Sequence, residues 1–481
     1  MLFNSFDFLI FFPLVVILYY TIRHSYRWLL LLVSSYYFYG ALEPSLIPLL
    51  WISTLTDYYC GKKIYGQKKQ KIRKIFLFIS LTINIGLLVG FKYLHFITSS
   101  FFELVEFLGL STTKPHVANN FVFSKILLPV GISFYTFQTM SYTIDVYRKK
   151  IVPEMHLGKF ALFVSFFPQL VAGPIERANR LLPQFYEKVK FNVKNIKRGL
   201  IFMAWGFFLK VVVADRLGIY VDEAFLNPAD HSGIPLALGG FFFGFQIYYD
   251  FSAYTAIAIG SAKVLGIDLM QNFNRPFFST SANEFWKKWH ISLMQWMRDY
   301  IYLPLRRNLK MSRLTSVFIV FFINGLWHGA NWTFIIWSLL NGLFLVVEIA
   351  TLPLRNKIFM ILKVPNVVVS FLGWVMTIGY LIFTLIFFRA SSLGHAFLYI
   401  KNVFRVRALN PNIIDNYLEV FISIGFIVLV QLIHYFKGNR KIYELVENKH
   451  FLTRWALYSA YILITVLFAI NRQNNFIYFQ F

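Results

Sequence analysis

This sequence contains very few cysteine residues and few charged residues. Cys60 is the only cysteine among 481 residues, so the chain cannot form an intrachain disulfide. Charged residues make up 14% of the chain, whereas an ordinary soluble domain has about 25%. So few charges cannot cover a water-exposed surface, and the apolar surplus must face something else. The composition therefore argues against a soluble protein.

Several motifs of familiar enzyme chemistry are absent as well. The chain has no Gly-x-Ser-x-Gly nucleophile elbow and no Walker-type phosphate loop. It also has no His-Glu-x-x-His pair and no cysteine-rich metal pattern. We therefore expect no resident metal and no bound cofactor. Internal repeats, which are common in secondary transporters, are missing too.

Long apolar stretches dominate what is present. Hydrophobic residues make up 57% of the chain, and aromatic residues 20%. No charged residue occurs in 75–91, 315–347 or 366–388, and 28–50 contains only Glu43. Each stretch is long enough to cross a hydrocarbon core of about 30 Å as a helix. Because lipid cannot satisfy backbone polar groups, the sequence predicts an all-α polytopic membrane protein.

We expect about ten to twelve membrane segments on grounds of length and apolar character. The first is interpreted as a retained helix, because no basic region precedes its apolar stretch. The run 315–347 has room for two helices, with a break near Asn324-Gly325. The predicted cores are 7–22, 28–50, 75–95, 122–143, 158–173, 199–214, 235–262, 315–347, 366–389, 418–436 and 453–470.

Basic residues outnumber acidic ones by 47 to 22, which gives a net charge of +25. They cluster in short segments between apolar runs, at 62–74, 148–150 and 306–313. This distribution follows the positive-inside rule and places these segments in the cytoplasm. Counting crossings from there predicts that the C-terminus at Phe481 lies outside. Since the charge is explained by membrane topology, we expect no nucleic-acid binding.

Residues 263–313 interrupt the apolar pattern. Phenylalanines and tryptophans there alternate with Lys287, Lys288 and Arg298. Basic residues mixed with tryptophan predict interfacial or re-entrant helices on the cytoplasmic side. Irregular backbone at membrane depth is tolerated only inside protein or beside water, so a buried cavity is expected here.

Two histidines stand out by their surroundings. His290 lies within the interrupted stretch, and His328 lies deep in an apolar run. A polar ring at membrane depth is costly and indicates a function, and imidazole exchanges protons near neutral pH. The alternative is a histidine that only hydrogen-bonds to a backbone carbonyl.

The motifs around these histidines are specific enough to indicate a family. The sequence resembles the membrane-bound O-acyltransferases, and within them the bacterial alginate O-acetyltransferase (AlgI-like) branch. The matching stretches are LPVGISFY at 128–135, FPQLVAGPI at 167–175, YDFSAY at 249–254, NFNRPF at 272–277, EFWKKWHISL at 284–293 and GLWHGAN at 325–331.

This resemblance implies a fold and a location. The whole chain, 1–481, would form one transmembrane domain of helices, with re-entrant or interfacial helices, around a central tunnel. The family core would span roughly 120–350. The C-terminal helices and an extracytoplasmic aromatic tail would occupy 366–481. The protein would lie in the bacterial cytoplasmic membrane as a multi-pass enzyme.

The resemblance also implies site residues. His328 would be the principal catalytic residue, with His290 along the same tunnel. Attack by a hydroxyl needs a base, and His328 fits that role. Asn331 is a candidate for stabilising the oxyanion. The remaining tunnel candidates are Trp286, Trp289 and Trp327.

The donor implied by the family is a cytoplasmic thioester, acetyl-CoA or an acyl carrier. Lys287, Lys288 and Arg298 are candidates for attracting its phosphates. Ordinary cytoplasmic retention explains the same three charges equally well. The acceptor would be a hydroxyl on a cell-envelope or exported polysaccharide. An extracytoplasmic transferase of the SGNH-hydrolase type would be a partner, because no such domain occurs in this chain.

The C-terminal sequence NFIYFQF, 475–481, resembles an aromatic motif of this branch whose tyrosine is an acyl relay. By that analogy Tyr478 would accept the acyl group and pass it on. The alternative is a tyrosine of the interfacial aromatic belt.

Two other functions stay open from the sequence. A D-alanyl transfer protein of teichoic-acid modification shares both histidine motifs and takes its donor from a carrier protein. A transporter or polymer-export subunit would need paired broken helices and a midplane ion site, which are not evident.

Overall fold

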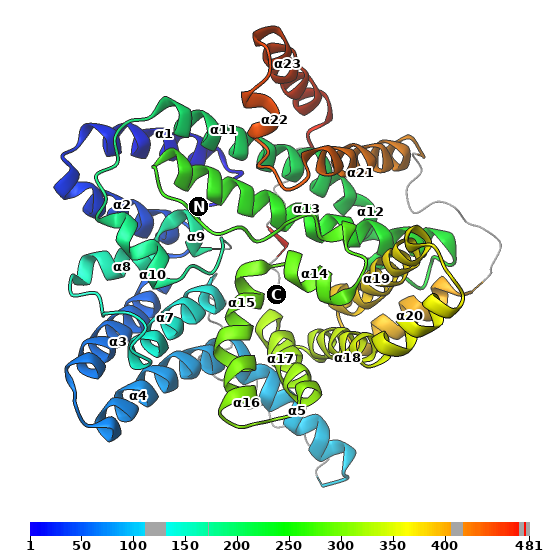
Figure 1. The fold of residues 1–481 in the computed structure, drawn as a ribbon, viewed down its shortest axis with the longest axis horizontal. Coiled ribbons are helices and arrows are strands. Elements are labelled where there is room, and N and C mark those ends of the chain that lie inside the picture. Colours follow the sequence, from blue (N-terminus) through cyan, green and yellow to red (C-terminus); the bar gives the residue numbers. More distant parts are fainter. Residues whose placement is uncertain (111–130, 172, 406–416, 471–475, 478–481) are drawn as a thin grey trace. The chain divides into compact units, whose positions relative to one another are not determined.

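The computed structural model describes residues 1–110, 131–171, 173–405, 417–470 and 476–477 (Figure 1). Within these ranges the secondary structure is entirely helical. The chain divides into two compact units, Met1–Lys197 with Ser261–Met270, and Arg198–Gly260 with Gln271–Phe481. The predicted all-α membrane fold is therefore confirmed.

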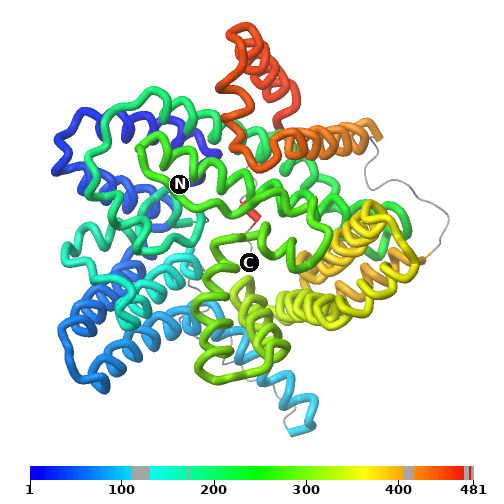
Figure 2. The backbone as a smooth tube through the Cα atoms, viewed as in Figure 1, coloured from blue at the N-terminus to red at the C-terminus, as the bar shows by residue number. Residues whose placement is uncertain are grey.

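The first unit is a group of packed helices, coloured blue to cyan in Figure 2. Its elements are α1 (Phe6–Thr21), α2 (His24–Gly40), η1 (Pro44–Leu46), α3 (Ile47–Gly66), α4 (Gln70–Leu88), η2 (Val89–Tyr93), α5 (Leu94–Phe107), α7 (Ile132–Tyr147), α8 (Leu157–Ser165), α9 (Phe167–Leu170), α10 (Ala178–Leu181) and η4 (Leu182–Phe185).

A buried carboxylate lies where α3, α4 and α7 pack together. Asp57 is completely buried, and its oxygens accept hydrogen bonds from Ser80, Asn84 and Thr143. A buried carboxyl group needs such donors, because leaving it unpaired would cost several kcal/mol. These bonds connect the three helices and fix their register.

The second unit holds both candidate histidines. Its elements are α11 (Val193–Phe207), η5 (Phe208–Ala214), α12 (Asp215–Leu226), α13 (Ile234–Val264), η6 (Pro276–Phe278), α14 (Ala282–Lys288), α15 (Ile291–Met297), η7 (Arg298–Tyr302), α16 (Leu303–Arg307), α17 (Arg313–His328), α18 (Trp332–Ile361), α19 (Asn366–Arg389), α20 (Leu393–Val403), α21 (Tyr417–Lys437), α22 (Glu444–Glu447) and α23 (Phe451–Phe468).

Among the described residues, five helices are long and apolar enough to cross a membrane, and two shorter apolar helices accompany them. The longest is the continuous stretch Gln70–Phe107, formed by α4, η2 and α5. The shorter pair is Phe6–Thr21 and Arg313–His328. The predicted segment 122–143 lies partly outside the described residues, and α7 covers its second half.

Two predicted spans are divided differently from the sequence-based expectation. The run 28–50 is broken between α2 and α3, because Pro44 removes a backbone donor and Glu43 before it is extended at φ −162°. The run 315–347 does form two helices, but Asn324 and Gly325 lie inside α17, and the break follows His328. Asn331 then begins α18 as its N-cap.

Candidate functional site

His328 is the last residue of α17, at the turn between two long apolar helices. The helix ends because Gly329 is extended, at φ −167° and ψ 157°, and Asn331 starts the next helix. His328 itself is only 4% exposed. An imidazole is thus held inside the protein by the junction of two packed helices.

Aromatic rings surround the imidazole of His328. Its ring centroid lies 4.9 Å from Trp327, 5.0 Å from Trp337 and 5.4 Å from Phe388, each nearly perpendicular. Trp337 comes from α18 and Phe388 from α19. These rings exclude water, and a water-poor site strengthens the electrostatic interactions within it.

Two glycines permit the close approach of α17 and α18. A Cβ on Gly329 would lie 2.2 Å from the ring of Phe334, and one on Gly325 would lie 2.8 Å from the carbonyl oxygen of Phe334. No side chain larger than hydrogen fits at such distances without movement of the neighbours. The glycines of the GLWHGAN motif therefore set the position of His328.

His290 lies between two short helices, α14 and α15, and is 1% exposed. Its backbone is left-handed, at φ 42° and ψ 54°, which is unfavourable for a residue other than glycine. Asn272 holds this turn: its carbonyl accepts from the backbone N–H of Ile291 at 2.9 Å, and its side-chain oxygen accepts from the hydroxyl of Ser292 at 2.6 Å.

One tryptophan connects the two histidines. The ring of Trp327 lies 5.5 Å from His290 and 4.9 Å from His328, so both imidazoles pack against it. His290 also contacts Phe251 at 4.7 Å. His290 lies outside the candidate membrane-spanning helices and is buried within the protein. This burial lowers the pKa of His290 to about 3, because the charged form loses its solvation. His290 is therefore a neutral imidazole.

The other two predicted tryptophans, Trp289 and Trp286, are both buried but have different surroundings. Trp289 stacks on Phe285 at 5.4 Å and packs against Phe273 at 5.2 Å, within the aromatic core. Trp286 faces a cavity, and its indole N–H has no hydrogen-bond partner among the described residues. The indole N–H of Trp337 is likewise without a partner there.

The cavity beside Trp286 has a volume of about 370 Å³ and combines apolar walls with basic groups. Its apolar wall includes Met294, Val317 and Phe321. The basic side chains at this cavity are Lys287, Arg298 and Arg313. A site of this composition suits a molecule that has an apolar part and anionic groups.

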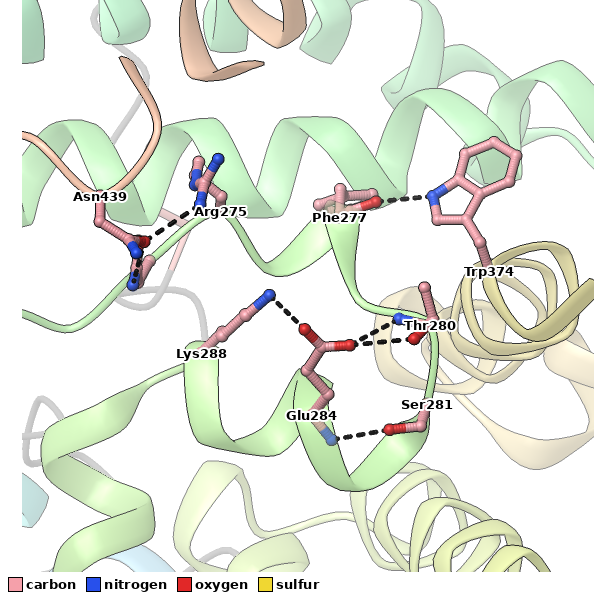
Figure 3. Close-up of polar contacts among 9 residues, drawn as sticks. Arg275, Phe277, Thr280, Ser281, Glu284, Lys288, Trp374 and Asn439 are labelled. Carbon is pink, nitrogen blue, oxygen red and sulfur yellow. Dashed lines mark hydrogen bonds and ion pairs between the residues drawn. The ribbon is translucent and has the colours of Figure 1, made fainter. Parts of the chain in front are cut away.

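Lys288 lies outside this cavity. Its ammonium group lies 2.6 Å from Glu284, whose carboxylate also accepts from Thr280 (Figure 3). Lys288 does not line the cavity, and Arg313 does. Of the three predicted donor-phosphate residues, the structure therefore brings Lys287 and Arg298 together and places Lys288 elsewhere.

Asn331 caps a helix. Its side-chain oxygen accepts from the backbone N–H of Thr333 at 3.0 Å, and its amide donates to the carbonyl of Ser391 at 3.1 Å. Both polar ends are therefore engaged in holding the start of α18. An oxyanion role for Asn331 stays a prediction.

Residues 476–477, near the C-terminus, pack against α13 in the second unit. The backbone N–H of Ile477 donates to the carboxylate of Asp250 at 2.8 Å, and Phe476 packs against Phe251 at 5.7 Å (the isolated red stretch in Figure 2). Lys210 lies 2.8 Å from the other oxygen of Asp250 and 2.9 Å from Asp215. Tyr478 lies outside the described residues, directly after this anchor.

Sequence reasoning missed several of these residues. Trp337 and Phe388 lie in uniformly apolar runs, where nothing marks them apart from other aromatic residues. Lys210 was detectable, since it is a charge within an apolar stretch, but its pairing with Asp250 depends on helix packing. No group of three metal-binding side chains occurs in the part of the chain that the structure describes.

Comparison with known proteins adds to this geometry. Residues 148–392, which include both histidines, match the sequence model of the membrane-bound O-acyltransferase family. A probable alginate O-acetylase AlgI of Pseudomonas aeruginosa is 34% identical over 448 residues, covering 92% of this chain and 82% of the relative.

Two further relatives differ in what they modify. A peptidoglycan O-acetyltransferase of Helicobacter pylori is 33% identical over 401 residues, covering 78% of this chain and 73% of the relative. A teichoic acid D-alanyltransferase of Streptococcus thermophilus is 29% identical over 245 residues, covering 48% of this chain and 59% of the relative.

Proposed function

The chain belongs to the membrane-bound O-acyltransferase family and is a membrane-embedded acyltransferase, and from this premise we propose that it transfers acetyl groups from a cytoplasmic thioester to hydroxyl groups of a cell-envelope polysaccharide. The observation that carries the proposal is the buried aromatic enclosure of His328, joined to His290 through Trp327. Family membership makes the chain an enzyme rather than a transporter or polymer-export subunit.

His328 acts as the general base in this proposal. As the acceptor oxygen attacks the acyl carbonyl carbon, its proton passes to His328. The carbon–sulfur bond then breaks, and the thiolate leaves with that proton. His290 packs on the other side of Trp327 and would line the same tunnel, while His328 takes the proton.

The negative charge on the carbonyl oxygen needs a hydrogen-bond donor. Trp337 contacts His328, and its buried indole N–H has no partner among the described residues, so it is available for that oxygen. Asn331 is the weaker candidate, because both ends of its amide already hold α18.

Acetyl-CoA is the proposed donor, bound in the cavity beside Trp286. Lys287, Arg298 and Arg313 would pair with its phosphates, and the apolar wall would receive the arm that carries the thioester. The basic segments place this entrance on the cytoplasmic side, by the positive-inside rule.

Tyr478 is proposed as the acyl relay on the opposite side. The backbone N–H of Ile477, the residue before Tyr478, donates to Asp250 of α13, and the neighbouring Phe251 contacts His290. The acetyl group would move from the thioester to the phenolic oxygen, and then to an extracytoplasmic transferase of the SGNH-hydrolase type. The polysaccharide would be acetylated in that last step.

The test is transfer of label from radiolabelled acetyl-CoA to purified protein in liposomes and to envelope polysaccharide. Replacing the base with His328→Ala should slow transfer by about 10²- to 10⁴-fold. Tyr478→Phe removes the phenolic oxygen that would accept the acetyl group, so it should lose both the label held on the chain and transfer to the polysaccharide. Native rates in a folded His328→Ala protein would refute the role of His328.

A second candidate is D-alanyl transfer from a carrier protein. It is favoured by the similarity to the teichoic acid D-alanyltransferase. Label that passes from D-alanyl carrier protein but not from acetyl-CoA would select this candidate, and the reverse result would select acetylation.

A further inference from the structure

A second basic cavity lies in the same unit and shares no residue with the proposed donor cavity. It has a volume of about 70 Å³ and lies among α13, residues 271–275 and the C-terminal end of α21. Its polar lining includes Thr255, Asn272, Arg275, His434, Lys437 and Lys441. A space of this size holds several water molecules, since roughly 10–15 Å³ suffices for one, and so has room for a small polyatomic ion.

Three cations converge on this small space. Arg275, Lys437 and Lys441 all line the cavity. The charges of Arg275 and Lys441 repel that of Lys437, and the carboxylate of Glu444 attracts it. Like charges gathered in a partly buried site raise its free energy, because solvent screens them poorly. An anion bound among the three would remove that cost.

Buried nitrogen atoms without partners provide independent support. His434 is 4% exposed, and its Nδ1 atom has no hydrogen-bond partner among the described residues. The same holds for the buried Nε atom of Arg275. Leaving such an atom unpaired costs about 1–3 kcal/mol. Both residues line the cavity, so an acceptor placed there would satisfy them.

The lining is also held in position. The ring of His434 packs against Tyr248 at 5.8 Å and Trp205 at 6.1 Å. Arg275 has a left-handed backbone, at φ 51°, and its guanidinium donates to the side chain of Asn439 at 3.0 Å (Figure 3). A guanidinium fixed in this way is suited to the oxygens of a phosphate.

We propose that this cavity binds a phosphate group, carried either by an anionic lipid or by a soluble phosphorylated molecule. The assignment rests on the three cations, the two unpartnered nitrogen atoms and the size of the space, and it does not depend on the acyl-transfer proposal. Asn272 lines the cavity and also holds the turn that carries His290, so occupancy should stiffen that turn.

The first measurement uses the full-length protein in detergent, with inorganic phosphate as the probe and chloride at equal ionic strength as the reference. Phosphate should raise the unfolding temperature of the native protein in a saturable way. Combining Arg275→Gln with Lys441→Gln should weaken the apparent Kd at least tenfold. The matched control Lys449→Gln, an exposed lysine of the same basic stretch, should stay within twofold of native.

A second measurement separates the two sources of phosphate. Native protein and double variant are each purified from nanodiscs of phosphatidylglycerol or phosphatidylcholine, and the bound lipid is identified by native mass spectrometry. If the source is a lipid, phosphatidylglycerol should stay bound to the native protein and be lost from the double variant. Protection by phosphate without such retention assigns a soluble ligand. Lys441→Gln alone serves if the double variant does not fold. Equal behaviour of native protein and folded variants in both measurements would overturn the proposal.

Discussion

Lys287 and Lys288 are neighbours in the chain, yet the structure gives them different surroundings. Lys287 lines the cavity beside Trp286, while Lys288 pairs with Glu284 within α14. Position along a short helix decides this, because successive side chains point in directions about 100° apart. The two lysines therefore form a matched pair for testing whether charge at the cavity attracts the donor.

We expect Lys287→Gln to raise the KM for acetyl-CoA about threefold to tenfold, equivalent to roughly 1 kcal/mol. Lys288→Gln should leave that KM within twofold, since its charge is already paired. Initial rates at several donor concentrations measure both. Equal effects of the two substitutions would show that the cavity does not distinguish them and would remove it as the donor site.

The anchor of the C-terminal segment depends on one carboxylate. Asp250 uses one oxygen for Lys210 and the other for the backbone N–H of Ile477. Asp215 shares Lys210, whereas the bond to Ile477 is made by Asp250. Asp250 is thus a positioning residue for Tyr478 in the relay proposal.

Asp250→Asn should reduce the acyl label held on the chain about tenfold or more, because a single amide oxygen cannot replace both carboxylate contacts. Asp215→Asn also removes a carboxylate from Lys210 but leaves the bond to Ile477, so it should retain the label better. The unfolding temperature of Asp250→Asn, measured separately, should stay close to that of the native protein. A large fall in unfolding temperature together with the loss of label would indicate a general structural role instead.

At the scale of elements, the α17–α18 pair positions the proposed base. The helix break follows His328 because Gly329 adopts an extended conformation against the ring of Phe334. The imidazole is consequently held where a helix end meets aromatic residues of α18 and α19. Small residues at such contacts let membrane helices approach closely.

Gly329→Ala should lower both the unfolding temperature and kcat, because the added methyl would overlap Phe334 and overpacking costs about 1–3 kcal/mol. Gly379→Ala in α19 is the control, since a Cβ there meets nothing within 4 Å. It should be neutral or slightly stabilising, as alanine favours a helix over glycine. Thermal unfolding in detergent measures both, and an unchanged Gly329→Ala protein would contradict the packing argument.

At the scale of the whole molecule, the charge distribution predicts orientation. Basic segments should lie in the cytoplasm and Phe481 outside, which the relay proposal also requires. The single native cysteine, Cys60, is buried and can be replaced without introducing charge.

In a Cys60→Ser background, an impermeant maleimide applied to intact spheroplasts should label Phe481→Cys and leave Lys449→Cys unlabelled. Permeabilisation should expose Lys449→Cys. Labelling of both positions, or of Lys449→Cys alone, before permeabilisation would contradict the predicted orientation. Such a result would also contradict the proposal that Tyr478 passes the acetyl group to an extracytoplasmic transferase.

Local patterns of composition were enough to predict the membrane character, the helical class and the two histidines of interest. Uncharged runs must be helical in lipid, and histidines inside such runs stand out wherever the rest of the fold lies. The motifs around His290 and His328 further indicated the family, which comparison with known proteins confirmed. The break after His328 was misplaced, because Asn-Gly resembles a turn but remains helical inside α17.

Contacts between distant segments were decided only by the tertiary structure. No local pattern distinguishes Trp337 and Phe388 from other aromatic residues, separates Lys287 from Lys288, or pairs Asp250 with Lys210 and the tail. Apolar runs in a membrane protein look alike along the chain, because lipid and protein interior favour the same side chains. Which face of a helix meets the site is therefore fixed by packing, and packing depends on the whole set of helices together.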